Sequence, residues 1–252
     1  MLHINYLYLL DRAKDTSSTS PLILDYGCGS GEAVEEARKL GYQIYGADTF
    51  DFQFFREPAT GRHLPEDAIR EIKDSKLDFP ADHFDAVITN QVFEHIVDLE
   101  TALAEIHRVL KSDGVLLAIF PSREIFREVH IGIPFAHRFR KGSRVRYPYT
   151  LVLRSLGFGC DKGGRSPKQW TIQSLESIDQ GTRYRTIADL RDQFSRYFEI
   201  DFIEQDYIRY RLSHHKLLSG LAPLVRLPLF GKLAVSMYRR LGGVVLRARK
   251  TS

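Results

Sequence analysis

The sequence predicts an α/β fold: a doubly wound, mostly parallel sheet with one inserted region and a helical extension at the C-terminus. Apolar runs of strand length alternate with amphipathic segments of helical periodicity through the first half of the chain. A glycine-rich turn directly follows the first of these runs. With 252 residues, 43% of them hydrophobic, the chain can form one sizeable domain with an appendage.

The first half of the chain supplies most of the predicted sheet. Four short apolar runs that end at turn residues predict strands at 22–26, 43–48, 84–90 and 114–121. Helical spacing between them predicts helices at 32–41, 65–72 and 99–114. The N-terminal "MLHINYLYLL" lacks the basic start and the cleavage site of a signal peptide, so we expect a helix or strand that docks on the domain.

The second half departs from this alternation. Residues 121–185 are rich in Gly, Pro, Arg and aromatic residues and are too long for an ordinary connection, which indicates an inserted lid or substrate region. Beyond it we expect a helix at 186–196 and strands at 198–204 and 206–212. These limits predict a main domain over 1–212 and an amphipathic helical extension over 213–252.

Charge is distributed unevenly along the chain. From Ser213 to Ser252 there are eight Lys or Arg residues and no Asp or Glu, whereas the preceding 212 residues carry 28 basic and 32 acidic side chains. A mildly acidic body with a basic, apolar tail indicates an anionic surface as partner, either membrane or nucleic acid. The two cysteines, Cys28 and Cys160, are too few for a disulfide framework, so we expect a reducing cytoplasm.

The stretch "LILDYGCGSGEA", residues 22–33, places glycines at 27, 29 and 31 between a strand and a helix. Glycine tolerates unusual φ and lets a ligand lie against the backbone, and such a turn faces the ligand crevice of an open α/β sheet. Asp48, at the tip of the next strand, can accept hydrogen bonds from ribose hydroxyls. The spacing is G-x-G-x-G behind Asp25, not the dinucleotide G-x-G-x-x-G, and a carboxylate there suits an ammonium group better than a phosphate.

Three blocks in order identify a family resemblance: "LDYGCGSGEAVEEARKLGYQIYGAD", "KLDFPADHFDAVITNQVFEHIVD" and "EIHRVLKSDGVLLAIFP". Together they resemble the class I S-adenosylmethionine-dependent methyltransferases, in particular the small-molecule "methyltransferase type 11" subgroup. The resemblance covers about residues 20–121 and implies a seven-stranded Rossmann-like sheet. Asp78 stands where that subgroup usually has proline, and "SDG" at 112–114 stands for "PGG".

The resemblance also implies roles for individual residues. Asp25 is expected near the methionine ammonium, Asp48 at the ribose hydroxyls, and Asp74 with Ser75 at the adenine amino group. The full set implied for S-adenosylmethionine is Asp25, Tyr26, Gly27, Cys28, Gly29, Gly31, Asp48, Thr49, Asp74, Ser75, Asn90 and Gln91.

Methyl transfer to a hydroxyl or a protonated amine needs a base, and imidazole suits neutral pH. His95 follows the strand at 84–90, while His130 and His137 lie in the inserted region, and we consider all three as catalytic candidates. Each can instead be a structural hydrogen-bonding residue. A metal site at Glu128, His130 and His137 has no tight ligand spacing, so no metal is predicted.

The basic side chains of the insertion suggest where an acceptor binds. Arg138, Arg140 and Arg144 can hold a phosphate or carboxylate with their guanidinium groups, or they can form a solvated loop. The insertion's aromatic side chains can stack on an acceptor or form a small core of their own. The apolar, basic tail fits a helix pair in a membrane interface, and equally a layer packed on the domain or on a second copy.

We therefore expect S-adenosylmethionine-dependent methyl transfer, at oxygen, to a small-molecule, sugar or lipid-linked acceptor. Nucleic acid is not favoured, because "TNQVFEH" stands where base-methylating enzymes carry an "NPPY"-type motif. The expected location is the cytoplasm, with peripheral attachment at the inner face of the membrane. Two alternatives stay open: a nicotinamide-dependent oxidoreductase, and a binding protein on the same fold without catalysis.

Overall fold

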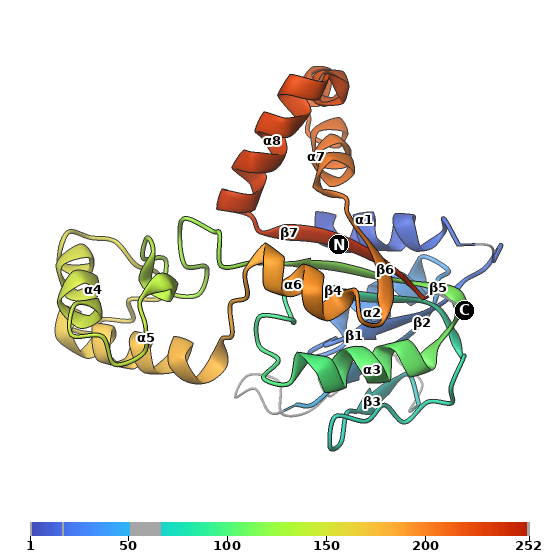
Figure 1. The fold of residues 1–252 in the computed structure, drawn as a ribbon, viewed down its shortest axis with the longest axis horizontal. Helices are drawn as coiled ribbons and strands as arrows, with labels where there is room; N and C mark the ends of the chain where they lie inside the picture. Colours follow the sequence, from blue (N-terminus) through green and yellow to red (C-terminus); the bar gives the residue numbers. More distant parts are fainter. Residues whose placement is uncertain (1, 17, 51–66, 251–252) are drawn as a thin grey trace.

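A computed structural model describes residues 2–16, 18–50 and 67–250 of the chain. It contains one seven-stranded sheet of order β3-β2-β1-β4-β5-β7-β6 (Figure 1). The strands are β1 Leu22–Tyr26, β2 Gln43–Asp48, β3 Ile69–Glu71, β4 Phe84–Asn90, β5 Leu110–Phe120, β6 Phe198–Phe202 and β7 Val244–Lys250. This is the expected Rossmann-like, mostly parallel sheet, and β7 is the antiparallel strand.

Helices cover both faces of the sheet, as the alternating sequence pattern predicts (Figure 1). On one face α3 and α6 bury their apolar stripes, and on the other face α1, α2 and α7 do so. The helices of the domain are α1 Ile4–Ala13, α2 Glu32–Lys39, α3 Leu99–Val109, α6 Ile187–Phe194 and α7 Glu204–Ser213. The N-terminal segment is therefore a docked helix, with Tyr8, Leu9 and Leu10 buried.

Two expected elements are wrong in type. Residues 69–71 form β3, a short edge strand paired with β2, where a helix at 65–72 was expected; residues 65 and 66 lie outside the described residues. Residues 206–212 belong to α7, not to a strand. Their tyrosines and isoleucine favour β structure locally, but Tyr207 is buried against α1, and this packing selects the helix.

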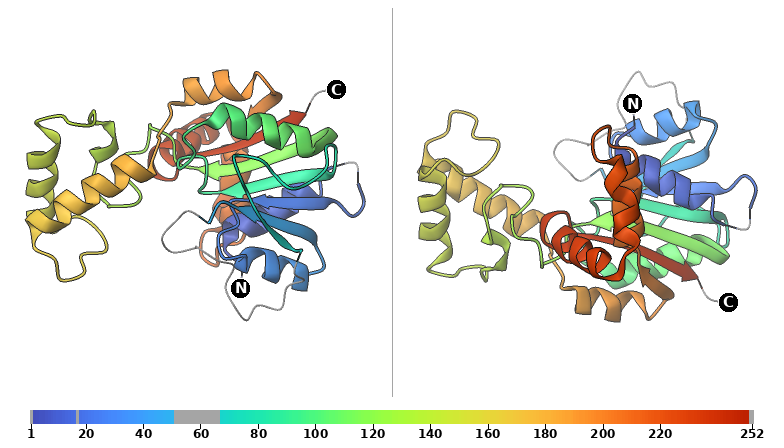
Figure 2. Two further views of the ribbon diagram at one scale, coloured as in Figure 1. Left: turned by 90° about the horizontal axis from the view of Figure 1, so that it is seen from below. Right: turned by 90° about the horizontal axis from the view of Figure 1, so that it is seen from above.

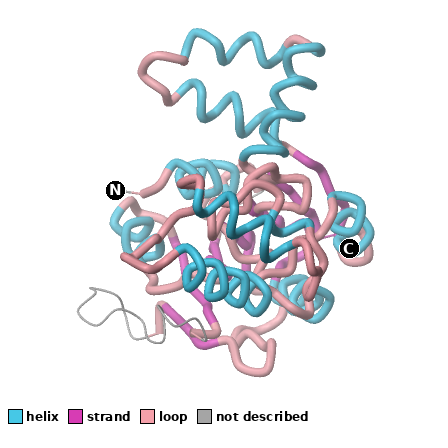
Figure 3. The backbone as a smooth tube through the Cα atoms, turned by 90° about the vertical axis from the view of Figure 1, so that its left-hand side faces the viewer, coloured by secondary structure: helices cyan, strands magenta, loops and turns pink. Residues whose placement is uncertain are grey.

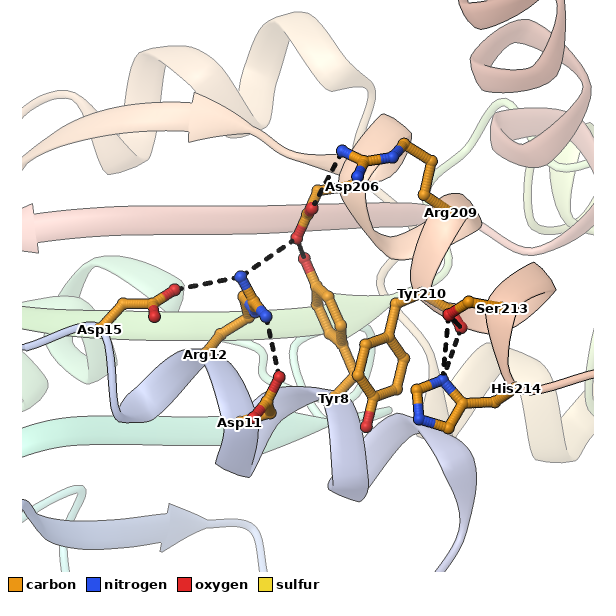
Figure 4. Close-up of polar contacts among 9 residues, drawn as sticks. All are labelled: Tyr8, Asp11, Arg12, Asp15, Asp206, Arg209, Tyr210, Ser213 and His214. Atoms are coloured by element: carbon orange, nitrogen blue, oxygen red, sulfur yellow. Dashed lines mark hydrogen bonds and ion pairs between the residues drawn. The ribbon is translucent and has the colours of Figure 1, made fainter. Parts of the chain in front are cut away.

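Polar contacts hold α7 against α1 (Figure 4). The Tyr8 hydroxyl donates to Asp206 at 3.0 Å, and the Arg12 guanidinium lies 3.8 Å from the same carboxylate. Arg12 also pairs with Asp11 on its own helix at 2.8 Å and with Asp15 in the turn after that helix at 3.2 Å. These contacts join an N-terminal helix to a C-terminal one, so they help to fix the base of the segment that follows α7.

The basic tail is not a separate helical extension. Its residues Val244–Lys250 form β7, which inserts between β5 and β6. Arg247 pairs with Asp201 at 2.8 Å, and the Lys250 ammonium pairs with Asp82 at 2.8 Å. The limit expected at residue 212 therefore falls inside one continuous fold, and part of the tail's charge is used within the sheet.

Between β6 and β7 the chain forms the C-terminal hairpin, which we define as α7, η2 (Ser219–Arg226) and α8 (Pro228–Leu241). Its outer part, η2 and α8, stands away from the sheet at the top of Figures 1 and 3. No single helix in the described ranges is long and apolar enough to cross a membrane. By length and composition, η2 and α8 pass that test together, with a bend of 111° between them.

The insertion at 121–185 projects from one end of the sheet (Figure 2). It carries η1 (Ala136–Arg138), α4 (Arg146–Ser155) and α5 (Pro167–Gly181) around a small apolar core of its own. Trp170 is at the centre of this core, and its indole N–H donates to the Cys160 carbonyl at 2.9 Å. Trp170, the most buried aromatic side chain of the insertion, thus packs in its core rather than stacking on an acceptor.

Candidate active site

A cavity of about 520 Å³ opens at the carboxyl ends of β1 and β4. Here β1 lies between β2 and β4, so the strand order reverses, and ligands of open α/β sheets bind at this place. The cavity brings together many of the residues expected to hold the cofactor or to act in catalysis: Tyr26, Gly27, Gly29, Asp48, Thr49, Ser75, Gln91 and His95.

The glycine loop has the backbone shape that its sequence predicts. Gly27, Gly29 and Gly31 all have positive φ, at 79°, 55° and 79°. A Cβ on Gly27 would lie 2.4 Å from Cγ2 of Val92, so a neighbouring side chain, as well as the turn, excludes a larger residue there. The Gly29 amide donates to the Asp48 carboxylate at 2.8 Å, which fixes the loop against the tip of β2.

Asp25 is fully buried beneath this loop and does not line the cavity. Within the described residues its two carboxyl oxygens have no hydrogen-bond partner that meets normal geometry. Burial raises the pKa of the Asp25 carboxyl to about 7, against the lowering effect of the nearby Tyr6 hydroxyl and with a further raising effect from Asp48. A cationic ligand group would stabilise the ionised form of this carboxyl.

A second cavity, of about 430 Å³, lies on the other side of the same loop. It shares Gly27, Gly29 and Gln91 with the first and adds Cys28 and Asn90 from the expected set. Its wall also includes Glu32 and Glu36 of α2. Gly31 lines neither cavity and instead forms the N-cap of α2.

The acidic residue expected at the adenine is only partly in place. Asp74 and Ser75 form a tight turn, and both have positive φ, at 50° and 59°. Ser75 lines the 520 Å³ cavity, whereas Asp74 lines a separate surface pocket on the β3 side. Of these two residues, only Ser75 therefore lines the 520 Å³ cavity.

The three candidate histidines lie in a row that starts at the cavity. His95 lines the cavity, and its Nδ1 is 2.6 Å from the Gly181 carbonyl. Its ring contacts that of His130, with centroids 5.0 Å apart. His137 is farther away, beyond Tyr184, and its Nε2 is 3.1 Å from the Arg123 carbonyl. Burial lowers the pKa of both His95 and His137.

The structure does not bring Arg138, Arg140 and Arg144 to this cavity. All three are exposed on the insertion. The Arg138 guanidinium donates to the Glu124 carbonyl at 2.8 Å and lies over the Phe135 ring, so it fastens the insertion's own backbone. The positive charges were visible in the sequence, but their direction depends on the fold of the insertion.

Sequence reasoning missed several residues of the site. Tyr6 reaches Asp25 from α1, and Val92 fills the space above Gly27. Gln180 and Gly181, at the end of α5, bring the insertion to the cavity wall. Glu94 is buried beside His95, and burial raises its pKa to about 7. Only the adjacency of Glu94 to His95 was visible in the sequence.

Comparisons with known proteins agree with this geometry. Residues 24–118 match a family model described as a methyltransferase domain. A similar curated protein is "Arginine-hydroxylase NDUFAF5, mitochondrial" from Danio rerio, 30% identical over 144 residues, which are 56% of this chain and 44% of that protein. Another is "Ubiquinone biosynthesis O-methyltransferase, mitochondrial" from Bos taurus, 31% identical over 105 residues, covering 37% of this chain and 27% of that protein.

The chain thus spans less than half of the length of both relatives. Among solved structures, an S-adenosylmethionine-dependent methyltransferase from Mesorhizobium loti has a TM-score of 0.54 and 14% identity, with 98% of both chains covered. At that identity the likeness shows the fold, and the matched family model adds the domain type.

Proposed function

We propose that this chain, whose residues 24–118 match a methyltransferase-domain model, is a class I methyltransferase that uses S-adenosylmethionine and transfers a methyl group to a small-molecule acceptor. The bound cofactor supplies an activated methyl group on a sulfonium. The protein then has to hold donor and acceptor in line, which can contribute about 7–11 kcal/mol to lowering a barrier. We further propose oxygen as the accepting atom.

The observation that carries this proposal is the pair of carboxylates around the glycine loop. Asp48 lies at the cavity wall, where it can accept hydrogen bonds from ribose hydroxyls. Asp25 is an unpartnered buried carboxyl behind the loop, within the described residues, and an amino-acid ammonium would complement its charge. The residues therefore fit the methionine and ribose parts of the cofactor.

The same contacts disfavour a nicotinamide dinucleotide. The Gly29 amide, which would face a phosphate in a dinucleotide loop, donates to Asp48 instead. Glu32 stands in the first turn of α2 and lines the adjoining cavity with Glu36. Carboxylates at that position repel a pyrophosphate.

The C-terminal hairpin supports a membrane-borne acceptor as the finer part of the proposal. It exposes a dense set of large apolar side chains: Leu217, Leu218, Leu221, Leu224, Leu227, Leu229, Phe230, Leu233, Met237 and Leu241. Exposed cations are interspersed with them: Lys216, Arg226, Lys232 and Arg240. Apolar side chains with flanking cations match an anionic lipid surface, and lipid-linked or sugar-lipid hydroxyls are acceptors that such a surface presents.

The first test measures cofactor choice and turnover separately. Thermal unfolding of the full chain is followed with S-adenosylhomocysteine, with NADH and with neither. A ligand at 100 times its Kd stabilises a protein by about 2.7 kcal/mol, so we expect a clear rise in Tm with S-adenosylhomocysteine and no rise with NADH. A rise with NADH, or none with saturating S-adenosylhomocysteine, would contradict the proposal.

Turnover needs its own measurement, because one relative is named as a hydroxylase. S-adenosylmethionine labelled in its methyl group is incubated with the protein and a panel of sugar and lipid-linked alcohols. Label in an alcohol of the panel, with the methyl group located on oxygen by NMR of the product, would support methyl transfer to oxygen. Cofactor binding without transfer to any member of the panel would favour the binding-protein alternative.

The membrane proposal is tested with point variants, because deleting the tail would remove β7 from the sheet. Leu229→Asp with Leu233→Asp changes two side chains that are 78% and 57% exposed, so the fold should tolerate it. We expect the variant to lose sedimentation with phosphatidylglycerol vesicles. Leu40→Asp, at a position 61% exposed on another part of the surface, is the matched control. Equal sedimentation of both variants would rule out binding through the hairpin.

A further inference from the structure

Three side chains converge beside the cofactor cavity. Each of Glu94, His95 and His130 has one atom that could coordinate a metal, a carboxylate oxygen or an imidazole nitrogen. These three atoms all lie within 4.8 Å of one another. Glu94 and His95 follow β4, whereas His130 comes from the insertion, so the fold brings together two distant segments. His95 lines the cavity, which places the cluster at its wall.

Hydrogen bonds orient both imidazoles. The Nδ1 of His95 is 2.6 Å from the Gly181 carbonyl, which can only accept, so Nδ1 carries the proton. The Nδ1 of His130 is 2.8 Å from the Glu128 carboxylate, which in turn accepts from the Ile131 amide at 2.6 Å. In both rings Nε2 is then the nitrogen that would coordinate a metal ion, as in the carboxylate–histidine and carbonyl–histidine pairs behind protein metal sites.

The charge balance also points to a cation. The side chains of Glu94 and Glu128 are both fully buried. In the part of the chain that the structure describes, each forms an ion pair only with a histidine, and neither Glu94 oxygen has a hydrogen-bond partner. Two buried carboxylates without Lys or Arg are costly, and one divalent cation would compensate both.

We propose that Glu94, His95 and His130 bind a divalent transition-metal ion, with Glu128 as the residue that positions His130. Two imidazoles and one carboxylate suit Zn²⁺, Mn²⁺ or Fe²⁺ and not Mg²⁺ or Ca²⁺, which prefer oxygen ligands. Around a tetrahedral zinc at 2.0–2.1 Å the ligand atoms lie about 3.3 Å apart, so small side-chain rotations close the site.

Given the proposed methyl transfer, an ion at this wall would bind the acceptor hydroxyl and lower its pKa. The hydroxyl proton leaves to solvent, the oxygen forms a bond to the methyl carbon, and the carbon–sulfur bond breaks to leave neutral S-adenosylhomocysteine. His95 then acts as a ligand rather than as the base. This role rests on the proposed function, whereas metal binding itself does not.

The test measures metal binding without turnover. Untagged full-length protein is freed of metal with EDTA, and ZnCl2, MnCl2 and MgCl2 are each titrated into it in a calorimeter. We expect one equivalent of zinc or manganese per chain and weaker binding of magnesium. Glu94→Gln and His130→Gln should each lower zinc affinity at least 100-fold, and Glu128→Gln should lower it about 10–100-fold. His107→Gln removes an imidazole on α3, outside the cluster, and is the control.

Folding is checked by the thermal midpoint and by S-adenosylhomocysteine binding. Because the Glu94 carboxyl oxygens have no hydrogen bond to lose in the described structure, Glu94→Gln should keep or raise the Tm of the metal-free protein while abolishing the shift caused by zinc. A purely structural carboxylate would instead lower that Tm. Failure of the wild type to bind zinc or manganese, tighter binding of magnesium, or wild-type zinc affinity in both ligand variants would overturn the proposal. Zinc binding without S-adenosylhomocysteine binding would instead contradict the proposed function.

Discussion

Replacing Asp25 with asparagine should stabilise the ligand-free protein at alkaline pH. The side chain is fully buried, and burial raises its pKa to about 7, with the Tyr6 hydroxyl opposing and Asp48 adding to the rise. In the unfolded chain the same carboxyl has a pKa of about 3.9. Between these two values the native state holds a proton that the unfolded state has lost, so wild-type stability falls as pH rises.

The magnitude follows from the two pKa values. Integrating proton binding from pH 5 to pH 8 gives a loss of about 2–3 kcal/mol in the wild type that an asparagine does not suffer. The other titrating groups, including Glu94, are common to both proteins and cancel in the difference. We therefore subtract the free energy of unfolding of the wild type from that of Asp25→Asn. This difference should rise by about 2–3 kcal/mol between pH 5 and pH 8.

Urea denaturation of both proteins at pH 5 and pH 8 measures this difference. The difference in free energy of unfolding between the two proteins could instead be equal at both pH values or smaller at pH 8. Either result would refute the account of Asp25 as a buried carboxyl with a raised pKa. The cofactor provides an independent readout, because an ammonium near Asp25 favours its ionised form. Wild-type affinity for S-adenosylhomocysteine should rise about tenfold from pH 6 to pH 8, whereas the variant should bind weakly at both.

Three further predictions concern packing and reactivity. Gly27→Ala places a Cβ against Val92 at positive φ and should cost about 2–4 kcal/mol in urea denaturation, part of which Val92→Ala recovers; an unchanged midpoint would contradict this. Trp170→Ala should cost about 3–5 kcal/mol and expose the insertion to limited proteolysis, with wild-type cleavage as the contrary result. Burial raises the pKa of Cys28 well above its usual value, so a thiol reagent should modify the less buried Cys160 first, and equal rates would argue against that burial.

The shape of the glycine loop could be predicted because its signals are local. A strand, a turn that requires positive φ and a helix follow one another within residues 22–39, and each depends on neighbours in sequence. The polar ends of β1, β2 and β4 then meet at one edge of a parallel sheet, as topology requires. Asp48 and Gln91 therefore line the same cavity.

The acceptor side could not be predicted in the same way. Arg138 donates a hydrogen bond to a backbone carbonyl of the insertion, and Gly181, not one of the expected arginines, lines the cavity. The reason is that the insertion folds around Trp170 and not around its charged side chains. A count of cations in a segment does not show which of them face a ligand.

By itself the sequence determined the alternation of strands and helices, the glycine loop and the resemblance to methyltransferases, because periodicity and turn chemistry act over a few residues. Only the tertiary structure decided that the end of the basic tail forms β7 in the sheet, that α7 is a helix packed on α1, and that Asp25 is fully buried. It also brought Glu94 close to His130, although α3 and β5 separate these two residues along the chain. Strand insertion, burial and the meeting of distant side chains depend on packing between segments that are far apart along the chain.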